Sequence, residues 1–359
     1  MSLSKIDLSL RHHFAFSKIT VLSCLIVFAF FHSTCVSQTV IYENNFDNDP
    51  TGQYSIANLN ADWNTPPFDN GVEEGRVSID DSSEAFAGKS LAVEYPAEMH
   101  RSANTGAQWQ LHFDQSYEEV TVEYRVKFKD GFDFVRGGKL PGLIGGTANT
   151  GSNRPDGTDG FSARMHWRTD GSQSSPLDSD RANITQYLYH PDQPNSFGED
   201  FRWDDSDSGE WELFDSGCWY HVRHRVVMNS VVNGVGQHDG VVQAWLDDKL
   251  VLDLDNIRFR DVETLAIDGF YFSTFFGGSG NQWNTSKDEV AFFDDFRISV
   301  PNSVLLGDVN GDGAVNFSDL GLFLTVLLGG GFQEEADIDQ NTVVNFMDIS
   351  PFINLFLSQ

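Results

Sequence analysis

The sequence predicts an all-β sandwich or jelly roll followed by a small helical domain. Between residues 40 and 300, short alternating runs of apolar and polar residues are separated by turns rich in glycine, asparagine, aspartate and serine. No convincing long amphipathic helix interrupts this stretch, and about ten strands at this spacing indicate two packed sheets. The end of the chain differs, because it holds one acidic pattern twice, each time followed by an apolar run of helical length.

Period-two alternation locates the individual strands, because successive side chains of a strand point to opposite faces of the sheet. The clearest strands are Ser90–Tyr95, Ala107–Phe113, Val120–Phe128, Ser162–Arg168, Ile184–Tyr189, Trp219–Met228, Gly240–Leu246, Ile267–Phe276 and Glu289–Ser299. The glycine-rich stretch from Phe132 to Gly146 is expected to turn the chain. Lys139 lies in the middle of that stretch, which would present its amine at a defined point.

The composition limits the possible partners. Of the 359 residues, 40% are hydrophobic, which is enough for a full core. The formal net charge is −30, and this excess of negative charge argues against nucleic acid or an anionic membrane as a partner. The same excess makes any local cluster of positive charge informative.

Residues 1–37 are predicted to be a secretory signal peptide. Three basic residues precede Ile19–Phe31, an apolar run too short to span a bilayer comfortably, and small residues before Gln38 fit a cleavage site. We therefore expect a secreted or cell-surface protein with no membrane span after cleavage. An uncleaved membrane anchor and a lipoprotein modified at Cys35 are the alternatives. Cleavage would leave a single cysteine, Cys218, which we expect to be buried.

A linker at residues 301–306 separates the predicted sandwich, residues 38–300, from a duplicated segment at residues 307–359. Each copy offers oxygen atoms at alternate positions of a twelve-residue loop, as a hard cation such as Ca²⁺ requires, and then forms one apolar helix, Leu320–Leu328 or Ile349–Leu357. The predicted ligands are Asp308, Asn310, Asp312, the Ala314 carbonyl and Asp319 in the first copy, and Asp337, Asp339, Asn341, the Val343 carbonyl and Asp348 in the second. We therefore expect calcium in a structural role.

This duplicated segment resembles a type I dockerin. The resemblance covers about fifty residues and implies a small all-α calcium-binding domain that docks to a cohesin-like module. The positions after each Val-Asn pair carry Phe317-Ser318 and Phe346-Met347 in place of the hydroxyl pair common in cellulosomal dockerins. This departure argues against a cellulosome-type partner and leaves an intramolecular or cell-surface role open.

Positive charge gathers in one part of the acidic sandwich. The polar face of the strand Ser162–Arg168 carries Ser162, Arg164, His166 and Arg168. Arg136 and Lys139 precede this strand in the glycine-rich stretch, and Tyr187 and Tyr189 share one face of the strand that follows. A locally positive groove in an acidic protein indicates an anionic ligand.

Lysine, arginine and tyrosine without a pair of carboxylates favour β-elimination over hydrolysis. A glycosidase needs two acids that flank the scissile bond, and the chain has no Glu-x-Asp-x-x-Glu strand. Elimination on a uronic acid polymer needs a cation that neutralises the carboxylate and stabilises an enolate-like intermediate. It also needs a base for the C5 proton and an acid for the leaving O4, but no catalytic cofactor.

The same residues resemble polysaccharide lyase family 14 and its relatives among the alginate and glucuronan lyases. The resemblance rests on the segment Gly-Gly-Lys139-Leu-Pro-Gly-Leu and on the Ser162-x-Arg164 and Tyr187-x-Tyr189 strands, in the family's order. It implies a concanavalin-like jelly roll, an anionic polysaccharide as substrate, and catalytic roles for these five residues. A longer insertion between Arg164 and Tyr187 departs from the family's pattern.

We expect Arg164, oriented by Ser162, to bind the uronate carboxylate. Lys139 is the candidate base or carboxylate neutraliser, and Tyr187 and Tyr189 transfer protons, without a choice between base and acid. Further substrate contacts are expected from Arg136, His166, Arg168 and His190. Mannuronate, guluronate and glucuronate remain alternatives as the sugar. A non-catalytic carbohydrate-binding module, a structural surface protein and a hydrolase with unrecognised carboxylates are the alternatives as the function.

Overall fold

The computed structural model describes residues 38–169, 180–205, 208–302, 305–312, 314–341 and 343–357. The predicted signal peptide and part of the insertion between Arg164 and Tyr187 lie outside the described residues. Within the described residues, no helix is long and apolar enough to cross a membrane.

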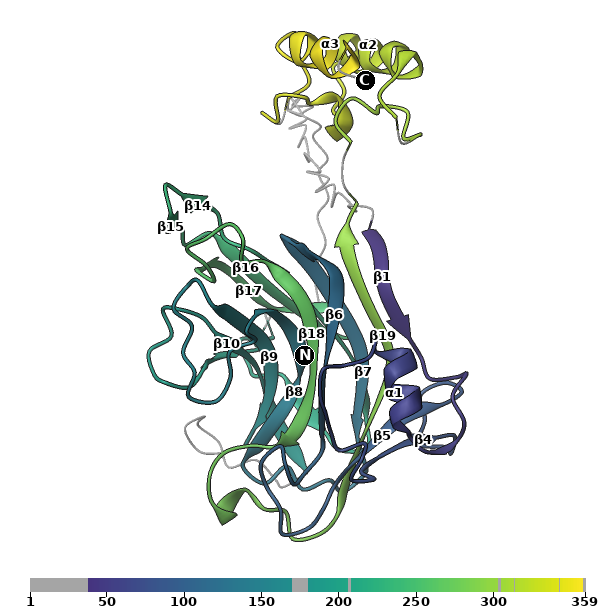
Figure 1. The fold of residues 1–359 in the computed structure, drawn as a ribbon, viewed down its shortest axis with the longest axis vertical. Helices are drawn as coiled ribbons and strands as arrows, with labels where there is room; N and C mark the ends of the chain where they lie inside the picture. The colour runs from purple at the N-terminus through teal and green to yellow at the C-terminus, as the bar shows by residue number, and fades with distance from the viewer. Residues whose placement is uncertain are drawn as a thin grey trace, which may run out of the picture. The chain divides into compact units, whose positions relative to one another are not determined.

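All but two of the strands in the described chain belong to two large antiparallel sheets (Figure 1). The first sheet orders its strands β17-β16-β13-β7-β19-β5-β4-β2, and β1 pairs with β19. Its strands are β1 (Gln38–Asn44), β2 (Gly52–Gln53), β4 (Val77–Asp80), β5 (Ser90–Tyr95), β7 (Glu119–Phe128), β13 (Trp219–Val227), β16 (Gly240–Leu246), β17 (Lys249–Ile257) and β19 (Glu289–Pro301).

The second sheet carries the polar strands that the sequence singled out. Its order is β11-β10-β9-β8-β18-β6-β3, with β12 paired to β10. Its strands are β3 (Asp69–Asn70), β6 (Ala107–Tyr117), β8 (Gly137–Gly146), β9 (Gly160–Arg168), β10 (Arg181–Tyr189), β11 (Glu199–Arg202), β12 (Leu213–Asp215) and β18 (Ile267–Phe276). A small hairpin, β14 (Val231–Val232) and β15 (Val235–Gly236), and the helix α1 (Ile56–Asp62) lie outside both sheets.

Aromatic side chains fill the space between the two sheets. Phe293 of the first sheet packs edge-on against Phe272 of the second, with ring centroids 5.1 Å apart. Phe128 and Trp167 make a second contact between the sheets at 5.2 Å. Such contacts belong to one continuous buried core, so the predicted two-sheet sandwich is confirmed.

The glycine-rich stretch differs from its prediction. Residues 137–146 were expected to form a turn but form β8, a strand in the middle of the second sheet. Glycine is required there because a Cβ atom at Gly142 would lie 2.1 Å from the carbonyl oxygen of Ala163. The close approach of β8 and β9 thus explains the glycines. Because glycines take these positions, the sequence lacks the alternation of apolar and polar residues that identifies a strand. Cys218 is another correction, because it is exposed in the turn before β13.

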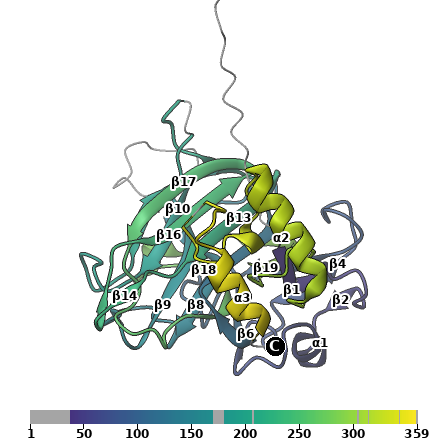
Figure 2. The same cartoon turned by 90° about the horizontal axis from the view of Figure 1, so that it is seen from above.

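The C-terminal segment has a small core of its own. Its helices α2 (Phe317–Gly329) and α3 (Ile349–Leu357) lie side by side (Figure 2), joined through the short helix η3 (Glu334–Ala336). Phe323 and Phe352 stack between them with centroids 4.2 Å apart. Asn316 and Asp319 form a capping box at the start of α2, which satisfies backbone N–H groups at the helix end. Both helices therefore lie where the duplicated pattern predicted them.

Candidate active site and candidate metal loops

A groove on the second sheet collects most of the predicted site residues. It encloses about 670 Å³, a volume in the range typical of ligand pockets. Its lining includes Lys139, Arg164, Tyr187 and Tyr189, together with Arg101, Arg136, Arg168, Tyr271, Phe275 and Trp283. Five of the lining side chains are basic and none that the structure describes is acidic. In a chain of net charge −30, this is a strongly localised positive surface.

Strand register brings the predicted residues together. Lys139 of β8 pairs with His166 of β9 and, on its other side, with Phe275 of β18. Arg164 of β9 pairs with Tyr187 of β10. Because residues in register lie opposite each other on the same face of a sheet, these side chains form one continuous patch.

Arg164 is a buried cation without an acidic partner among the described residues. Its side chain is 2% exposed, and its guanidinium group donates to the hydroxyl of Ser273 on β18 over 3.2 Å. The guanidinium carbon also lies 5.9 Å from the Tyr187 ring centroid and 5.3 Å from that of Tyr271. The Nε atom of Arg164 is buried without a hydrogen-bond partner. A buried guanidinium group with unused donors is suited to bind a carboxylate.

The expected role of Ser162 is not what the structure shows. The Ser162 hydroxyl donates to the backbone carbonyl of Asn149 over 2.8 Å, so it ties the loop after β8 to β9. Arg164 instead extends across β8 to Ser273. The orienting hydroxyl comes from a strand that is distant in sequence, which is why the spacing on β9 did not reveal it.

Lys139 lies on the groove floor between aromatic rings. Its Nζ atom is 4.8 Å from the Tyr187 ring centroid and 5.9 Å from that of Phe275. Burial, together with the positive charges of Arg168 and Arg164, lowers the pKa of the Lys139 amine well below its usual range, while Asp200 opposes this shift. An amine with a lowered pKa is neutral over more of the pH range and can accept a proton.

Tyr187 and Tyr189 are connected directly. Their hydroxyl oxygens are 3.2 Å apart, and the Tyr189 hydroxyl donates to the backbone carbonyl of Gly151 over 2.6 Å. Burial and the neighbouring Tyr189 raise the pKa of Tyr187. Tyr187 is therefore protonated at any ordinary pH, as a proton donor must be.

An unpredicted carboxylate, Asp200 of β11, holds residues in and next to the groove. It accepts from His166 Nδ1 over 2.8 Å, from Arg168 Nη2 over 2.9 Å and from the Thr185 hydroxyl over 2.9 Å. Burial would raise the pKa of Asp200, but the surrounding His166, Arg168 and Lys139 lower it overall. Asp200 is thus ionised. The insertion after β9 separates it in sequence from His166 and Arg168, which concealed it.

His166 and His190 do not reach the groove as expected. The His166 ring stacks against Tyr187 at 3.6 Å between centroids and supports the tyrosine ring, and burial lowers the pKa of His166. His190 follows Tyr189 and therefore points to the opposite side of the chain. Its Nε2 atom lies 3.0 Å from a carboxylate oxygen of Glu199. Arg136 and Arg168 do line the groove.

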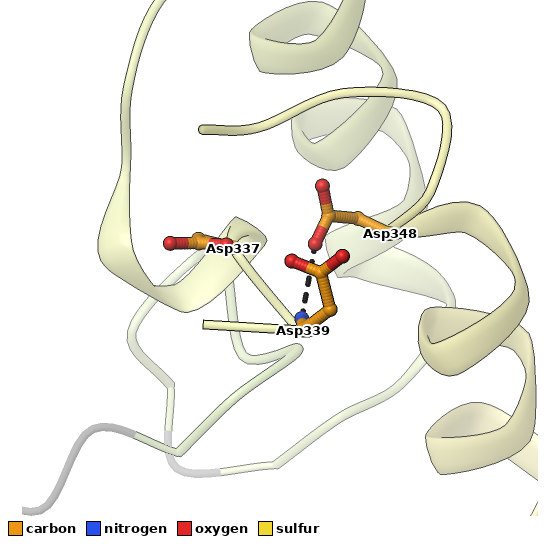
Figure 3. Close-up of side chains that lie close together, drawn as sticks. All are labelled: Asp337, Asp339 and Asp348. Carbon is orange, nitrogen blue, oxygen red and sulfur yellow. Dashed lines mark hydrogen bonds between the residues drawn. The ribbon is translucent and has the colours of Figure 1, made fainter. Parts of the chain in front are cut away.

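The two acidic loops have matching internal hydrogen bonds. Asp319 accepts from the backbone N–H of Asn310 over 3.0 Å, and Asp348 accepts in the same way from Asp339 over 3.1 Å (Figure 3). Oxygen atoms of Asp337, Asp339 and Asp348 lie within 4.8 Å of one another. Carboxylates this close repel each other unless a cation joins them.

The donor atoms of both loops suit a hard cation. All of the side chains predicted as ligands offer oxygen, and Asp308, Asp319, Asp337 and Asp348 are almost completely buried. Residues 307–359 contain no lysine or arginine that could neutralise them. The carbonyl groups of Ala314 and Val343 accept from Asn316 and Asn345 over 3.1 and 3.0 Å, which places them in equivalent settings in the two loops.

Comparison with known proteins identifies the sandwich. A family model described as polysaccharide lyase 14 matches residues 83–296, which is more than half of the chain. The protein belongs to polysaccharide lyase family 14. A search of curated protein sequences found no match to this lyase.

Solved structures of lyases share the fold. The alginate lyase Aly36B is 28% identical, with a TM-score of 0.59 over 72% of this chain and 95% of its own. The PL-14 alginate lyase from Aplysia kurodai is 22% identical, with a TM-score of 0.57 over 72% of this chain and 98% of its own. The alginate lyase vAL-1 from Chlorella virus is 22% identical, with a TM-score of 0.51 over 71% of this chain and 99% of its own. The predicted enzyme class, a polysaccharide lyase, is confirmed.

Proposed function

We propose that this lyase cleaves alginate by β-elimination in the groove of the second sheet. The observation that carries the proposal is the buried Arg164, which has no acidic partner among the described residues and lies in a groove lined by five basic and no acidic side chains. A polymer with one carboxylate on each sugar complements such a surface. Hydrolysis would instead require a pair of carboxyl groups beside the substrate.

The groove supplies one residue for each step of elimination. Arg164 neutralises the uronate carboxylate, which makes the C5 proton more acidic. Lys139, whose pKa is lowered by burial and by the nearby arginines, takes that proton in its neutral form. The electron pair released from the C5–H bond forms the C4=C5 double bond as the C4–O4 bond breaks, and Tyr187 protonates the departing O4.

The proton balance closes without water or a cofactor. Lys139 ends the step protonated and Tyr187 ends it deprotonated. The Tyr189 hydroxyl, 3.2 Å from that of Tyr187, offers a path for the proton that restores the starting state. The products are one chain with an unsaturated non-reducing end and one with a new reducing end.

Alginate is the preferred substrate because Aly36B, named an alginate lyase, is 28% identical over nearly its whole length. An Aly36B variant with one lysine and one tyrosine replaced by alanine was solved with an alginate tetrasaccharide. That protein therefore holds an alginate tetrasaccharide with one lysine and one tyrosine replaced. A lysine and a tyrosine, Lys139 and Tyr187, are also the residues proposed here for proton transfer.

The test is ultraviolet absorbance of the unsaturated product over time. Polymannuronate, polyguluronate and glucuronan would be offered separately to the protein from Gln38 onward. We expect absorbance to rise on an alginate block, to be lost in Lys139→Ala and to persist in Lys249→Ala, a lysine on the other sheet that pairs with Asp205. New reducing ends without absorbance would indicate a hydrolase, and neither signal would indicate a binding module.

The C-terminal segment is proposed to be a dockerin-like domain stabilised by calcium. Its carboxylate-rich loops support this, and bound Ca²⁺ would supply the charge that holds them together. Phe317, Phe346 and Met347 are each at least 70% exposed, so they would offer an apolar surface to a cohesin-like partner. Binding of a purified cohesin panel with and without calcium would test this, and no binding in either condition would refute it.

Residues 1–37 are proposed to direct export. Their basic start and short apolar run support a cleaved signal peptide. Cleavage before Gln38 would release the protein outside the cell or at its surface. Amino-terminal sequencing of protein recovered from the culture medium would test this, and an uncleaved N-terminus in the membrane fraction would contradict it.

A further inference from the structure

The loop after β18 forms one wall of the groove and is firmly anchored. Asn284 donates to the backbone carbonyl of Glu98 over 2.7 Å, and its side-chain oxygen lies 2.7 Å from His100 Nδ1. The backbone N–H of Gly277 donates to the carbonyl of Gly137, at the start of β8, over 3.2 Å. Both ends of the loop are therefore fixed to neighbouring segments.

This loop places Trp283 beside two of the groove's arginines. The guanidinium carbons of Arg136 and Arg168 lie 5.7 and 5.8 Å from the Trp283 ring centroid, and Arg101 lines the same groove. The indole packs on Gly278, where a Cβ atom would come within 2.0 Å of the ring and where φ is +115°. Glycine is needed at that position so that the indole can occupy the wall.

The Trp283 cluster is distinct from the proposed reacting centre. Gly137 pairs with Arg168 and Lys139 pairs with His166, so Arg168 lies two residues, or about 7 Å, along β9 from the row of Lys139. The same loop touches Lys139, because a Cβ atom at Gly277 would lie 3.0 Å from its Nζ atom. A polymer held at Lys139 and Arg164 would thus bring a neighbouring sugar to Trp283.

We propose that Trp283, Arg136 and Arg168 form a binding subsite for the uronate next to the one that reacts. An aromatic ring can take the apolar face of a sugar, while arginine binds its carboxylate. Arg168 uses Nη2 on Asp200, which fixes the guanidinium group and directs its other donors to a ligand. This subsite rests on the proposed function, since it requires a polymer that carries a carboxylate on adjacent sugars.

The test measures binding to oligosaccharides of increasing length. Lys139→Ala serves as the parent because it binds without turnover, and the probes are mannuronate and guluronate oligomers from the disaccharide to the hexasaccharide. Each added sugar that reaches a subsite strengthens binding. The increment is the decrease in Kd that one added sugar causes. We expect Trp283→Ala to remove one such increment, about a tenfold change in Kd, and to leave the increments of the other sugars unchanged. Arg136→Gln should reduce the same increment, and the two losses should not add.

Two controls separate a subsite from general damage. Trp245 lies on the other sheet with Arg223 4.5 Å from its ring centroid, so Trp245→Ala removes a similar pair outside the groove and should leave every increment unchanged. Phe197, 59% exposed, lines the groove beside Tyr189, and Phe197→Ala should affect a different increment. Trp283→Phe keeps an aromatic ring and should lose less than Trp283→Ala.

Two results would overturn the subsite. One is a length series for Trp283→Ala that matches the parent. The other is a uniform loss at every length, which would indicate a structural role for the loop. Because binding is measured without turnover, failure of the elimination mechanism would appear separately, as a wild-type protein that binds these oligomers and does not cleave them.

Discussion

Replacing Arg164 with methionine should leave the protein about as stable while it destroys activity. Burying a guanidinium group without a counter-ion costs several kcal/mol. Arg164 recovers about 1.5–3 kcal/mol through the bond from its guanidinium group to Ser273. The cation–π contacts with Tyr187 and Tyr271 return about 0.5–2 kcal/mol each. These contacts together return about 2.5–7 kcal/mol, which is comparable with the cost of burial. Methionine has a similar length and no charge, so the replacement should change the stability by no more than about 2 kcal/mol.

The melting temperature should therefore change by no more than about 4 °C, at about 2 °C per kcal/mol for a domain of this size. Activity should fall, because the uronate carboxylate loses its cation. Removing such a group lowers rates by about 10²–10³-fold. Calorimetry and the absorbance assay on the same preparation would measure both effects.

Arg260 is the matched control, because it is equally buried but fully used by the protein. Its guanidinium group donates to the backbone carbonyls of Asn229 and Leu265 over 3.0 and 2.8 Å, and it also bonds Glu118. Arg260→Met should destabilise by about 3–5 kcal/mol, since two buried carbonyls lose a charged donor. If Arg164→Met lowered the melting temperature as Arg260→Met does, Arg164 would be a structural residue. Retained activity would likewise refute its role.

Three further results are expected. The value of kcat/KM should rise with pH as Lys139 loses its proton. Because the charge of Asp200 raises the pKa of Lys139, Asp200→Asn should move this rise to lower pH. A rise that stays in place or moves to higher pH would contradict this. Tyr187→Phe keeps the ring on His166 but lacks the acid, so kcat should fall about 10²–10⁴-fold with little change in KM, and an unchanged kcat would exclude Tyr187. Chelation of calcium should unfold the C-terminal helices, which circular dichroism and proteolysis would detect, and should leave lyase activity intact. Asp348→Asn should have the same effect. Helices that stay folded under both treatments would exclude a structural role for the metal.

The sequence predicted the fold wherever one face of a strand is buried. The predicted strands Ser90–Tyr95 and Ile267–Phe276 match β5 and β18 at both ends. Apolar residues at alternate positions show which face of such a strand packs on the core. The strand β8 was missed because glycines take several of its positions where neighbouring groups lie too close for a side chain, which interrupts the alternation. Lys249–Ile257 was also missed as β17, since its exposed edge position leaves an irregular pattern.

The site was predictable where its residues lie on adjacent strands. Lys139, Arg164 and Tyr187 belong to β8, β9 and β10, which follow one another in the sequence and in the sheet. Ser273 and Trp283 come from β18 and its loop, which pair with β8 from far along the chain. No spacing in the sequence relates them to Lys139. The orientation of Arg164 and the wall of the groove therefore became evident only from the sheet order.

The most direct test of elimination is the fate of water oxygen during cleavage. Alginate would be digested in water enriched in a heavy oxygen isotope, and the products weighed by mass spectrometry, with Lys139→Ala as the control. Elimination predicts products whose new ends carry no heavy oxygen at the time of cleavage and whose non-reducing ends have lost one water, none of which form with Lys139→Ala. Incorporation of one heavy oxygen atom for each bond broken, with saturated ends, would mean hydrolysis and would contradict the roles of Lys139, Arg164 and Tyr187.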